Sequence, residues 1–506
     1  MRGLTLLPGP LTMSLLTLVL LLLGVWAWRR RRFLNALKDA GVPGPEPGFF
    51  MGNVMEFRYG TRPCHLLIDD WLKQYGDFVA YHMGIHRYVV VKDLDLLRDV
   101  FIKDFKRFST RPPPSISTED FSNSVLQVDP QRWKPMRSLM VSCFSAFKMK
   151  QMSPLVSKCM DTMEEVVDAK ITRGDEVDVH ALFQALTCDV IAACALALKA
   201  NCQKDPNDPF LHRVRFFMEH ASNPITESAF AFPVIADVFG LILKTFALSE
   251  HMVKMINDNM TRVIQMRRQD KRTRYQDILQ AMLDASGEGE GIHSKLQLTD
   301  QEIKSNALVL VLAGYETTAN ALTSTSYLLA KNQHVQEKLY QEISEQLPAD
   351  EEMRYDQLAS LPYLDQVLCE SMRLYPPVVT FVSRHSPEPT SLGPYRLPAG
   401  TNILAPVWSI HHDPAVWPDP EKFDPDRFSK EQREGRHPMA WLAFGAGPRN
   451  CLGMRFGMLE SKMALVRLVR RYRLEMGEST PHELSFVVPT VTLCTKGEIK
   501  LNMTPR

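Results

Sequence analysis

The sequence has few cysteines for its length, and none of them lies in a paired motif. Nine cysteines are spread over 506 residues, and no two form a C-x-x-C pattern. This density is far too low for a disulfide-stabilised secreted scaffold. We therefore expect a mostly reduced body that faces the cytosol, in which a typical cysteine is a small buried hydrophobic residue.

The sequence also has no excess of positive or negative charge. The 59 basic and 58 acidic residues leave a formal net charge of +1. Such a balance gives no long-range attraction for nucleic acid, which excludes that class of partner. There is no internal repeat and no low-complexity tract. With 45% hydrophobic residues, the chain can form two or three average domains, or one large catalytic unit behind a tail.

One long apolar run stands near the N-terminus. Residues 11–28 carry no charge, and as a helix they would span about 27 Å, enough to cross the hydrocarbon core of a bilayer. Four arginines follow at 29–32, whereas only Arg2 precedes the run. Because basic residues collect on the cytosolic side, we expect a lumenal N-terminus at 1–10, a transmembrane anchor at 11–28 and a cytosolic body.

The alternative to an anchor is a cleaved secretory signal. Such a signal needs basic residues before the apolar run and small residues at its end. Here the charges follow the run, and Trp26 and Trp28 lie at its end, so the sequence favours the anchor. Prolines and glycines crowd residues 41–48 and impose extended backbone. We therefore expect 29–50 to be a basic, Pro/Gly-rich hinge that separates the anchor from a catalytic domain at 51–506.

The body shows helical periodicity over most of its length. Short β-rich runs occupy about 60–110, helical patterns dominate from about 130 to 375, and proline, glycine and short extended runs follow residue 385. One helical pattern returns from Leu459 to Tyr472. The predicted fold class is therefore mainly α with a smaller β portion.

One predicted helix is unusually long. A capping-box pattern from Thr299 to Glu302 precedes an apolar run, and the helix can continue to about Lys331. A helix of this length and apolarity must cross the core. Yet Gly314 and Glu316 stand in its middle, where glycine costs about 1 kcal/mol and a carboxylate needs a partner or water. The pattern indicates either a buried bend or a functional site.

Glycines and a proline surround one cysteine near the C-terminus, in the sequence FGAGPRNCLG at 444–453. A thiolate metal ligand needs a tight loop with backbone N–H groups directed at its sulfur, and a following helix adds favourable potential. The spacing of Phe444, Gly447, Arg449, Cys451 and Gly453 resembles the haem-binding loop of the cytochrome P-450 family. The resemblance implies the P-450 fold, with haem b (iron protoporphyrin IX) bound and Cys451 as the proximal iron ligand.

Other motifs agree with this resemblance and occur in the family's order. Glu370 and Arg373 share one face of a predicted helix, and Arg427 follows about fifty residues later. In the family, a Glu-Arg-Arg network of this kind has a structural role: it supports the loop that carries the cysteine.

Candidate partners of the two haem propionates are also present. Trp133 and Arg137 share one helical face and resemble the family's propionate-binding helix. Arg384 matches an arginine expected after the Glu-x-x-Arg helix, and Arg449 is the third candidate. Two carboxylates in a largely apolar pocket require such cations.

The segment AGYETT at 313–318 resembles the family's oxygen-activation segment. The resemblance implies that Thr317 holds dioxygen and an ordered water by hydrogen bonds, while Glu316 relays protons from solvent. The implied function is a haem-thiolate monooxygenase that inserts one oxygen atom from O2 into lipophilic substrates (steroids, lipids or xenobiotics). Electrons would come from NADPH through NADPH-cytochrome P-450 reductase, with cytochrome b5 as a second candidate partner. The implied location is the endoplasmic reticulum membrane, crossed once.

Within the family, AGYETTA, EKFDPDRFSKE and GPRNCLGMRFGMLESKMAL resemble the animal microsomal family-3 enzymes and their relative thromboxane synthase. Two other functions stay open. A haem-thiolate isomerase of a prostaglandin endoperoxide needs neither a reductase nor a proton-delivering threonine, so the Glu316–Thr317 pair favours monooxygenation. A haem-binding sensor without turnover would need neither of these features.

Family geometry also implies where substrate and reductase bind. The expected pocket is lined by 112–125, 309–317, 379–382 and 486–488, whose apolar side chains suit lipophilic substrates. The apolar connection at 230–239 either packs inside or enters the bilayer, and the resemblance favours the second. No flavin or nicotinamide motif is present, so electrons must come from outside. Lys134, Arg137 and Arg455 are the expected contacts of the reductase.

Overall fold

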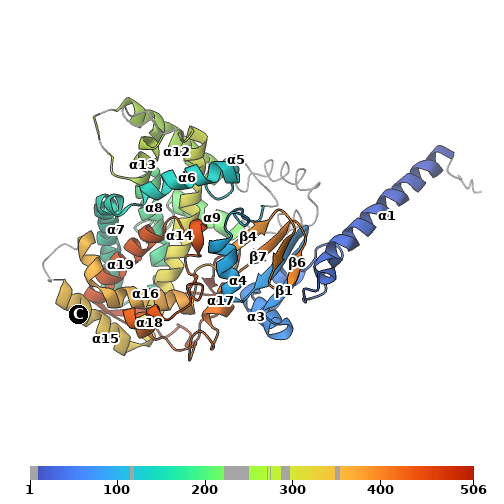
Figure 1. The fold of residues 1–506 in the computed structure, drawn as a ribbon. Helices are drawn as coiled ribbons and strands as arrows, with labels where there is room; N and C mark the ends of the chain where they lie inside the picture. Colours follow the sequence, from blue (N-terminus) through green and yellow to red (C-terminus); the bar gives the residue numbers. More distant parts are fainter. Residues whose placement is uncertain are drawn as a thin grey trace, which may run out of the picture.

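The computed structural model describes residues 10–113, 119–220, 250–270, 272–273, 275–286, 297–347 and 354–506. The apolar connection at 230–239 lies outside these residues, as does part of the expected 112–125 loop. A large helical body carries a smaller β-rich part, and one long helix projects from the β-rich end (Figure 1). The predicted fold class, mainly α with a smaller β portion, is confirmed.

Helices dominate from about 130 to 375, as the sequence predicts, but helices also lie within 60–110, where it predicts only short β-rich runs. The described α-helices are α1 (Pro10–Asp39), α2 (Val54–Tyr59), α3 (Cys64–Tyr75), α4 (Leu94–Arg98), α5 (Glu119–Ser122), α6 (Pro130–Cys143), α7 (Ala146–Thr172), α8 (Val179–Leu196), α9 (Pro209–His220), α12 (Glu250–Gln269), α13 (Ile278–Asp284), α14 (Asp300–Lys331), α15 (Gln333–Gln346), α16 (Pro362–Leu374), α17 (Val407–His411), α18 (Lys430–Glu434) and α19 (Met454–Arg471). A π-helix, η1 (Asp99–Lys103), and 3-10 helices η2 (Tyr355–Ser360), η3 (Pro425–Phe428) and η4 (Gly447–Arg449) lie between them.

The strands are short and form four small sheets. They are β1 (Phe78–Met83), β2 (His86–Val91), β3 (Val177–Asp178), β4 (Ser383–Ser386), β5 (Thr390–Leu392), β6 (Tyr395–Leu397), β7 (Thr401–Leu404), β8 (Tyr472–Met476), β9 (Phe486–Val487), β10 (Cys494–Thr495) and β11 (Lys500–Pro505). The largest sheet has the order β1-β2-β7-β4 and contains one parallel pair, β2 with β7. It therefore joins the start of the body to the segment after residue 383.

Helix α14 is the predicted long helix, and it runs for 32 residues through the centre of the body. Its capping box forms as expected, because the Thr299 hydroxyl accepts from the Glu302 N–H while the Glu302 carboxylate accepts from the Thr299 N–H. Gly314 permits a close approach of α8, since a Cβ at this position would lie 3.1 Å from Ile191 Cδ1. The mid-helix glycine is therefore explained by helix packing and not by a bend.

The structure differs from the sequence expectation at residues 29–50. Helix α1 does not end at Trp28 but continues through the four arginines to Asp39. The reason is tertiary packing: Arg30, Leu34 and Leu37 recur at helical spacing and are buried against the body. The segment 42–47 is neither helix nor strand, as its prolines predict.

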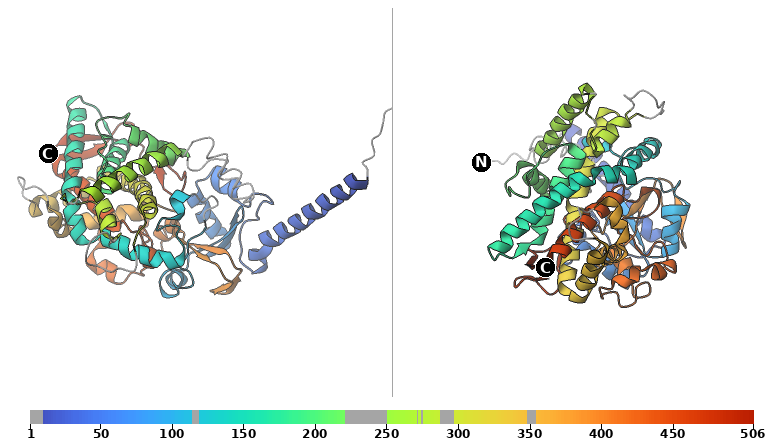
Figure 2. Two further views of the ribbon diagram at one scale, coloured as in Figure 1. Left: turned by 90° about the horizontal axis from the view of Figure 1, so that it is seen from above. Right: turned by 90° about the vertical axis from the view of Figure 1, so that its left-hand side faces the viewer.

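Helices α1 and α8 are both long and apolar enough to cross a membrane, judged by length and composition. The apolar window of α8 is 78% buried inside the body, so α8 is a core helix. The window of α1 is not buried at all. In Figure 1 and in the left view of Figure 2, which is turned by 90°, α1 extends away from the body.

Candidate active site around Cys451

The loop that carries Cys451 is a tight turn before α19. Gly445 and Gly447 have positive φ angles of 67° and 70°, and the Cys451 N–H donates to the Phe444 carbonyl at 2.8 Å. A Cβ on Gly447 would lie 1.9 Å from the Phe101 carbonyl oxygen of η1. Glycine at this position is therefore required both by the backbone angle and by the close approach of η1.

Cys451 is an exposed residue, although protein atoms are packed closely around its thiol. Burial raises the pKa of the thiol, and the Gly453 N–H together with Arg137 and Arg111 opposes this shift. Gly453 is also the N-cap of α19, so the positive end of that helix adjoins the sulfur. These groups would stabilise a thiolate.

The three residues predicted to brace this loop form one buried network. Arg373 makes a bidentate ion pair with Glu370, with N···O distances of 2.8 and 2.9 Å, and both side chains are fully buried. Arg427 approaches Glu370 at 3.4 Å. Arg373 also donates to the carbonyls of His411 and Pro420. The network therefore ties α16 and η3 to the segment before the cysteine loop.

His411 connects this network to the cysteine loop, and no sequence motif singles it out. Its Nε2 accepts from the Leu442 N–H at 2.8 Å, which leaves Nδ1 to donate to the Arg373 carbonyl at 3.2 Å. One neutral tautomer satisfies both contacts. Burial, with His412 and Arg373 nearby, lowers the pKa of His411 well below its usual value. The ring therefore stays neutral at physiological pH.

Four arginines converge on the same loop. Arg384 donates to the Ala446 carbonyl at 3.1 Å. Arg137 donates to the backbone and side-chain oxygens of Asn450, both at 2.9 Å, and Arg111 donates to the Arg449 carbonyl at 3.3 Å. Arg449 itself donates to the Ser109 carbonyl at 2.5 Å, and its guanidinium lies 4.1 Å from the centre of the Trp133 ring.

This arginine cluster has the properties of a site for two carboxylates. In the part of the chain that the structure describes, the hydrogen-bond acceptors of the four guanidiniums are carbonyl and amide oxygens, not carboxylates. Burial and mutual repulsion lower the pKa of Arg111 to about 10 and that of Arg449 to about 9. Arg111 Nε and Arg384 Nε are buried without a partner. The donor set therefore fits the propionates of a haem.

Arg111 is a member of the cluster that the sequence analysis missed. It precedes three prolines in a segment without regular structure, so no helical spacing relates it to the other arginines. Only the three-dimensional structure shows that Arg111 belongs to the cluster. Its guanidinium also lies 4.3 Å from the centre of the Phe381 ring.

The predicted acid–alcohol pair lies in the middle of α14. Thr317 Oγ1 donates to the Ala313 carbonyl at 2.6 Å, so its lone pairs can accept a hydrogen bond from water. Glu316 is buried, and its Oε2 accepts from the Thr492 hydroxyl at 2.6 Å. Because the two side chains are adjacent in a helix, they point in different directions, and Thr492 holds the carboxylate.

Further polar side chains continue from Thr492 toward the N-terminal turn of α8. Thr492 Oγ1 lies 3.6 Å from Cys494 Sγ, which accepts from Asn320 Nδ2 at 3.6 Å. Asn320 Oδ1 lies 3.2 Å from His180 Nε2. Thr492, Asn320 and Cys494 were not selected from the sequence, because the contacts join segments about 175 residues apart.

Packing brings the pair on α14 close to the cysteine loop. The first turns of α19 lie against α14, where a Cβ on Gly457 would be 3.7 Å from Thr318 Oγ1. The expected pocket segment 379–382 also lies near α14 and is joined to residues just beyond the expected segment 486–488: the Val379 N–H donates to the Val491 carbonyl, and Val378 forms a β-bridge with Thr492. The segments near 379 and 490 are therefore joined beside Glu316.

A cysteine sulfur at a helix N-terminus, a braced loop and an arginine cluster suited to carboxylates are features that fit a haem held by a thiolate ligand. The family model described as cytochrome P450 matches residues 42–503. The chain therefore belongs to the cytochrome P450 family of enzymes, whose cofactor is a haem iron.

The chain is similar to two groups of curated proteins over nearly its full length. It is 31% identical to thromboxane-A synthase of Rattus norvegicus, with 98% of each chain covered. It is 30% identical to cytochrome P450 3A6 of Oryctolagus cuniculus, with 88% of this chain and 87% of the relative covered. Cytochrome P450 3A5 of Homo sapiens is also 30% identical, with 93% and 92% covered. The predicted resemblance to these two groups is confirmed.

Gly447→Ala is predicted to disrupt the cysteine loop. The new Cβ would overlap the Phe101 carbonyl, and alanine is strained at a φ of 70°. We expect a loss of about 3 kcal/mol in unfolding free energy and loss of haem binding, measured by denaturant unfolding and by the carbon monoxide difference spectrum. Gly435→Ala is the matched control, since its Cβ meets nothing within 4 Å. Equal effects of the two substitutions would contradict this account.

His411 is predicted to make stability depend on pH. In the unfolded chain this histidine takes up a proton near pH 6.5, whereas the folded site holds it neutral. Its contribution is therefore complete above pH 6.5 and is lost as pH falls, by at most about 1.4 kcal/mol per pH unit. His411→Asn should lower stability at pH 8 and make the pH dependence below pH 6.5 shallower, as measured by denaturant unfolding. An unchanged slope of the unfolding free energy against pH would show that groups other than His411 cause the pH dependence.

Proposed function

We propose that the protein is a monooxygenase that inserts one oxygen atom from O2 into lipophilic substrates (steroids, lipids or xenobiotics). When bound through Cys451, haem b supplies the iron centre at which dioxygen is activated. The observation that carries the proposal is the pair on α14, because oxygen cleavage needs protons and an isomerisation does not.

The residues of this pair are suited to proton delivery. Thr317 donates its hydroxyl hydrogen to the Ala313 carbonyl, so it can anchor an ordered water as an acceptor. Glu316 is held by Thr492 and can exchange a proton with such a water. The apolar segments expected around the pocket would orient a lipophilic substrate.

The remaining parts of the proposal concern the membrane and electron transfer. We infer that residues 11–28 of α1 cross the endoplasmic reticulum membrane once, with the catalytic domain in the cytosol. NADPH-cytochrome P-450 reductase supplies electrons, with cytochrome b5 as a second donor. Lys134 and Arg455 are exposed and available to a reductase, whereas Arg137 is engaged with Asn450. Lys134 and Arg455 are therefore the surface contacts we propose.

The second candidate function is rearrangement of a prostaglandin endoperoxide. It is favoured by the similarity to proteins named thromboxane-A synthase, at 31% and 32% identity over 98% of the chain. The two functions differ in their need for electrons, because an isomerisation consumes none.

The deciding experiment is product formation by the membrane-bound protein with reductase, with and without NADPH. The mixture contains steroid-like probes and a prostaglandin endoperoxide. Hydroxylated probes that appear only with NADPH are the expected result. Endoperoxide rearrangement that is independent of NADPH, without hydroxylation, would establish the isomerase instead.

Thr492→Val is predicted to impair oxygenation without preventing haem binding. The substitution keeps the side-chain shape and removes the hydroxyl that holds Glu316. We expect kcat for hydroxylation to fall about tenfold and more NADPH to be consumed per product, measured with peroxide release in the same assay. Thr492→Ser keeps the hydroxyl and is the control. If the Val variant forms as much product per NADPH consumed as the Ser variant, Thr492 has no role in oxygenation.

A further inference from the structure

One of the four consecutive arginines after the apolar run differs from the other three. The Arg30 side chain is buried, with 9% of its surface exposed, whereas Arg29, Arg31 and Arg32 are exposed. Arg30 donates to three backbone carbonyls of the body: Phe49 at 2.8 Å, Phe50 at 2.8 Å and Gly84 at 2.9 Å. Arg30 belongs to a basic run that would direct membrane topology, but it also makes specific hydrogen bonds to the body.

The rest of the C-terminal half of α1 is also attached to the body. Leu37 is fully buried and belongs to the core formed with the β1-β2-β7-β4 sheet, and Leu34 is 7% exposed. Phe33 packs against His82, and the guanidinium of Arg87 lies 4.7 Å from the centre of the Phe33 ring. These contacts extend over about two helical turns, so α1 and the body form one continuous unit.

The attachment gathers aromatic side chains where α1 leaves the body. Trp26 lies 5.5 Å from Phe49 and 6.2 Å from Phe50, measured between ring centres. Despite these contacts, 41% of Trp26 and 56% of Phe50 remain exposed. Exposed aromatic rings beside an apolar helix and basic residues match the composition of a membrane interface.

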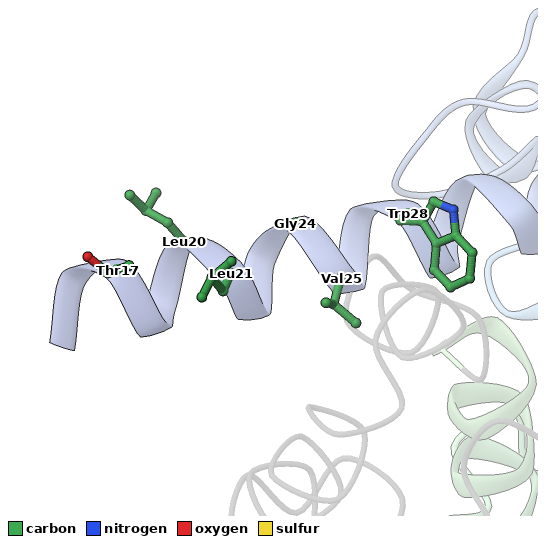
Figure 3. A pocket seen from close by; sticks show the side chains of 6 residues that line it. All are labelled: Thr17, Leu20, Leu21, Gly24, Val25 and Trp28. Carbon is green, nitrogen blue, oxygen red and sulfur yellow. The ribbon is translucent and has the colours of Figure 1, made fainter. Parts of the chain in front are cut away.

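The helix beyond this aromatic cluster is mostly apolar and exposed, with Thr12, Ser14 and Thr17 as its polar residues. Leu20, Leu21 and Val25 project from α1 around Gly24, where a shallow groove lies on the helix (Figure 3). Each of these three side chains is between 49% and 64% exposed. The groove is bounded by α1 alone and lies outside the body, so it is no substrate pocket. The groove ends at Trp28, and the exposed rings of Trp26 and Phe50 lie at the same end of the apolar segment, which argues for one occupant, the lipid bilayer.

We propose that Arg30 fastens the anchor helix to the catalytic domain, so that α1, Trp26, Phe49 and Phe50 contact the bilayer as one rigid unit. This unit fixes the tilt of the catalytic domain relative to the membrane. The proposal rests on the membrane anchoring by α1 proposed above. Arg29, Arg31 and Arg32 remain available to anionic lipid headgroups, and Arg30 has a separate role.

The run of arginines provides matched variants. Arg30→Ala and Arg31→Ala remove the same charge from neighbouring positions, but only the first removes the three hydrogen bonds to carbonyls. Arg30→Lys keeps the charge but lacks the planar fork that reaches three separate oxygens. Phe50→Ser tests the aromatic contact with lipid and leaves Arg30 in place.

The experiment measures the orientation of the full-length holoenzyme in oriented bilayers by linear dichroism of the haem absorbance. Wild type and Arg31→Ala should share one well-defined tilt. Arg30→Ala and Arg30→Lys should lose most of the dichroism, and proteinase K should cleave residues 41–50 at least about tenfold faster. Phe50→Ser should shift the tilt. An unchanged carbon monoxide difference spectrum verifies that the catalytic domain of each variant is folded.

Two outcomes would overturn the proposal, and they are distinguishable. Dichroism and cleavage of Arg30→Ala equal to those of Arg31→Ala would show that Arg30 does not fix the orientation, while the anchoring stands. Release of the wild-type protein from membranes by alkaline carbonate would refute the anchoring itself, and this proposal with it.

Discussion

The site depends on keeping one sulfur accessible to a ligand while most of the water around it is displaced. A thiolate in such a place is unfavourable unless fixed donors and positive potential replace its solvation. The Gly453 N–H, the N-terminus of α19 and the nearby arginines supply these. These groups stabilise the thiolate only if the loop is rigid. This requirement explains the fully buried ion pair that supports the loop. A buried pair contributes little net stability. Its value here is the fixed direction of the hydrogen bonds from Arg373 to surrounding carbonyls.

The arginine cluster places a second constraint on the fold. Four guanidiniums packed around residues 446–450 repel each other, and the lowered pKa values of Arg111 and Arg449 reflect this repulsion together with burial. A carboxylate ligand would relieve the repulsion and satisfy the buried Nε atoms of Arg111 and Arg384. Folding of this region and binding of an anionic cofactor should therefore be coupled, since whatever binds the folded state stabilises it.

Local signals in the sequence predicted the elements whose causes are local. The capping box at Thr299, the glycine-rich loop at 444–453 and the shared face of Trp133 and Arg137 each depend on residues a few positions apart. Arg111, His411 and Thr492 could not be found in this way, because their partners lie far along the chain. The end of α1 was misplaced for a related reason: its last turns are helical because the body covers one face.

The same features suggest how the membrane and the site are connected. Leu37 of α1 packs into the core that also contains Phe101, and Phe101 belongs to η1, whose carbonyl abuts Gly447. The anchor helix, the sheet and the cysteine loop are thus joined by a short series of packed residues. A helix that moved freely would give the catalytic domain no preferred face toward the lipid. If α1 enters the bilayer as proposed, its attachment presents the same face of the catalytic domain to the lipid at each encounter, which favours a substrate that is dissolved in the bilayer and enters from one side.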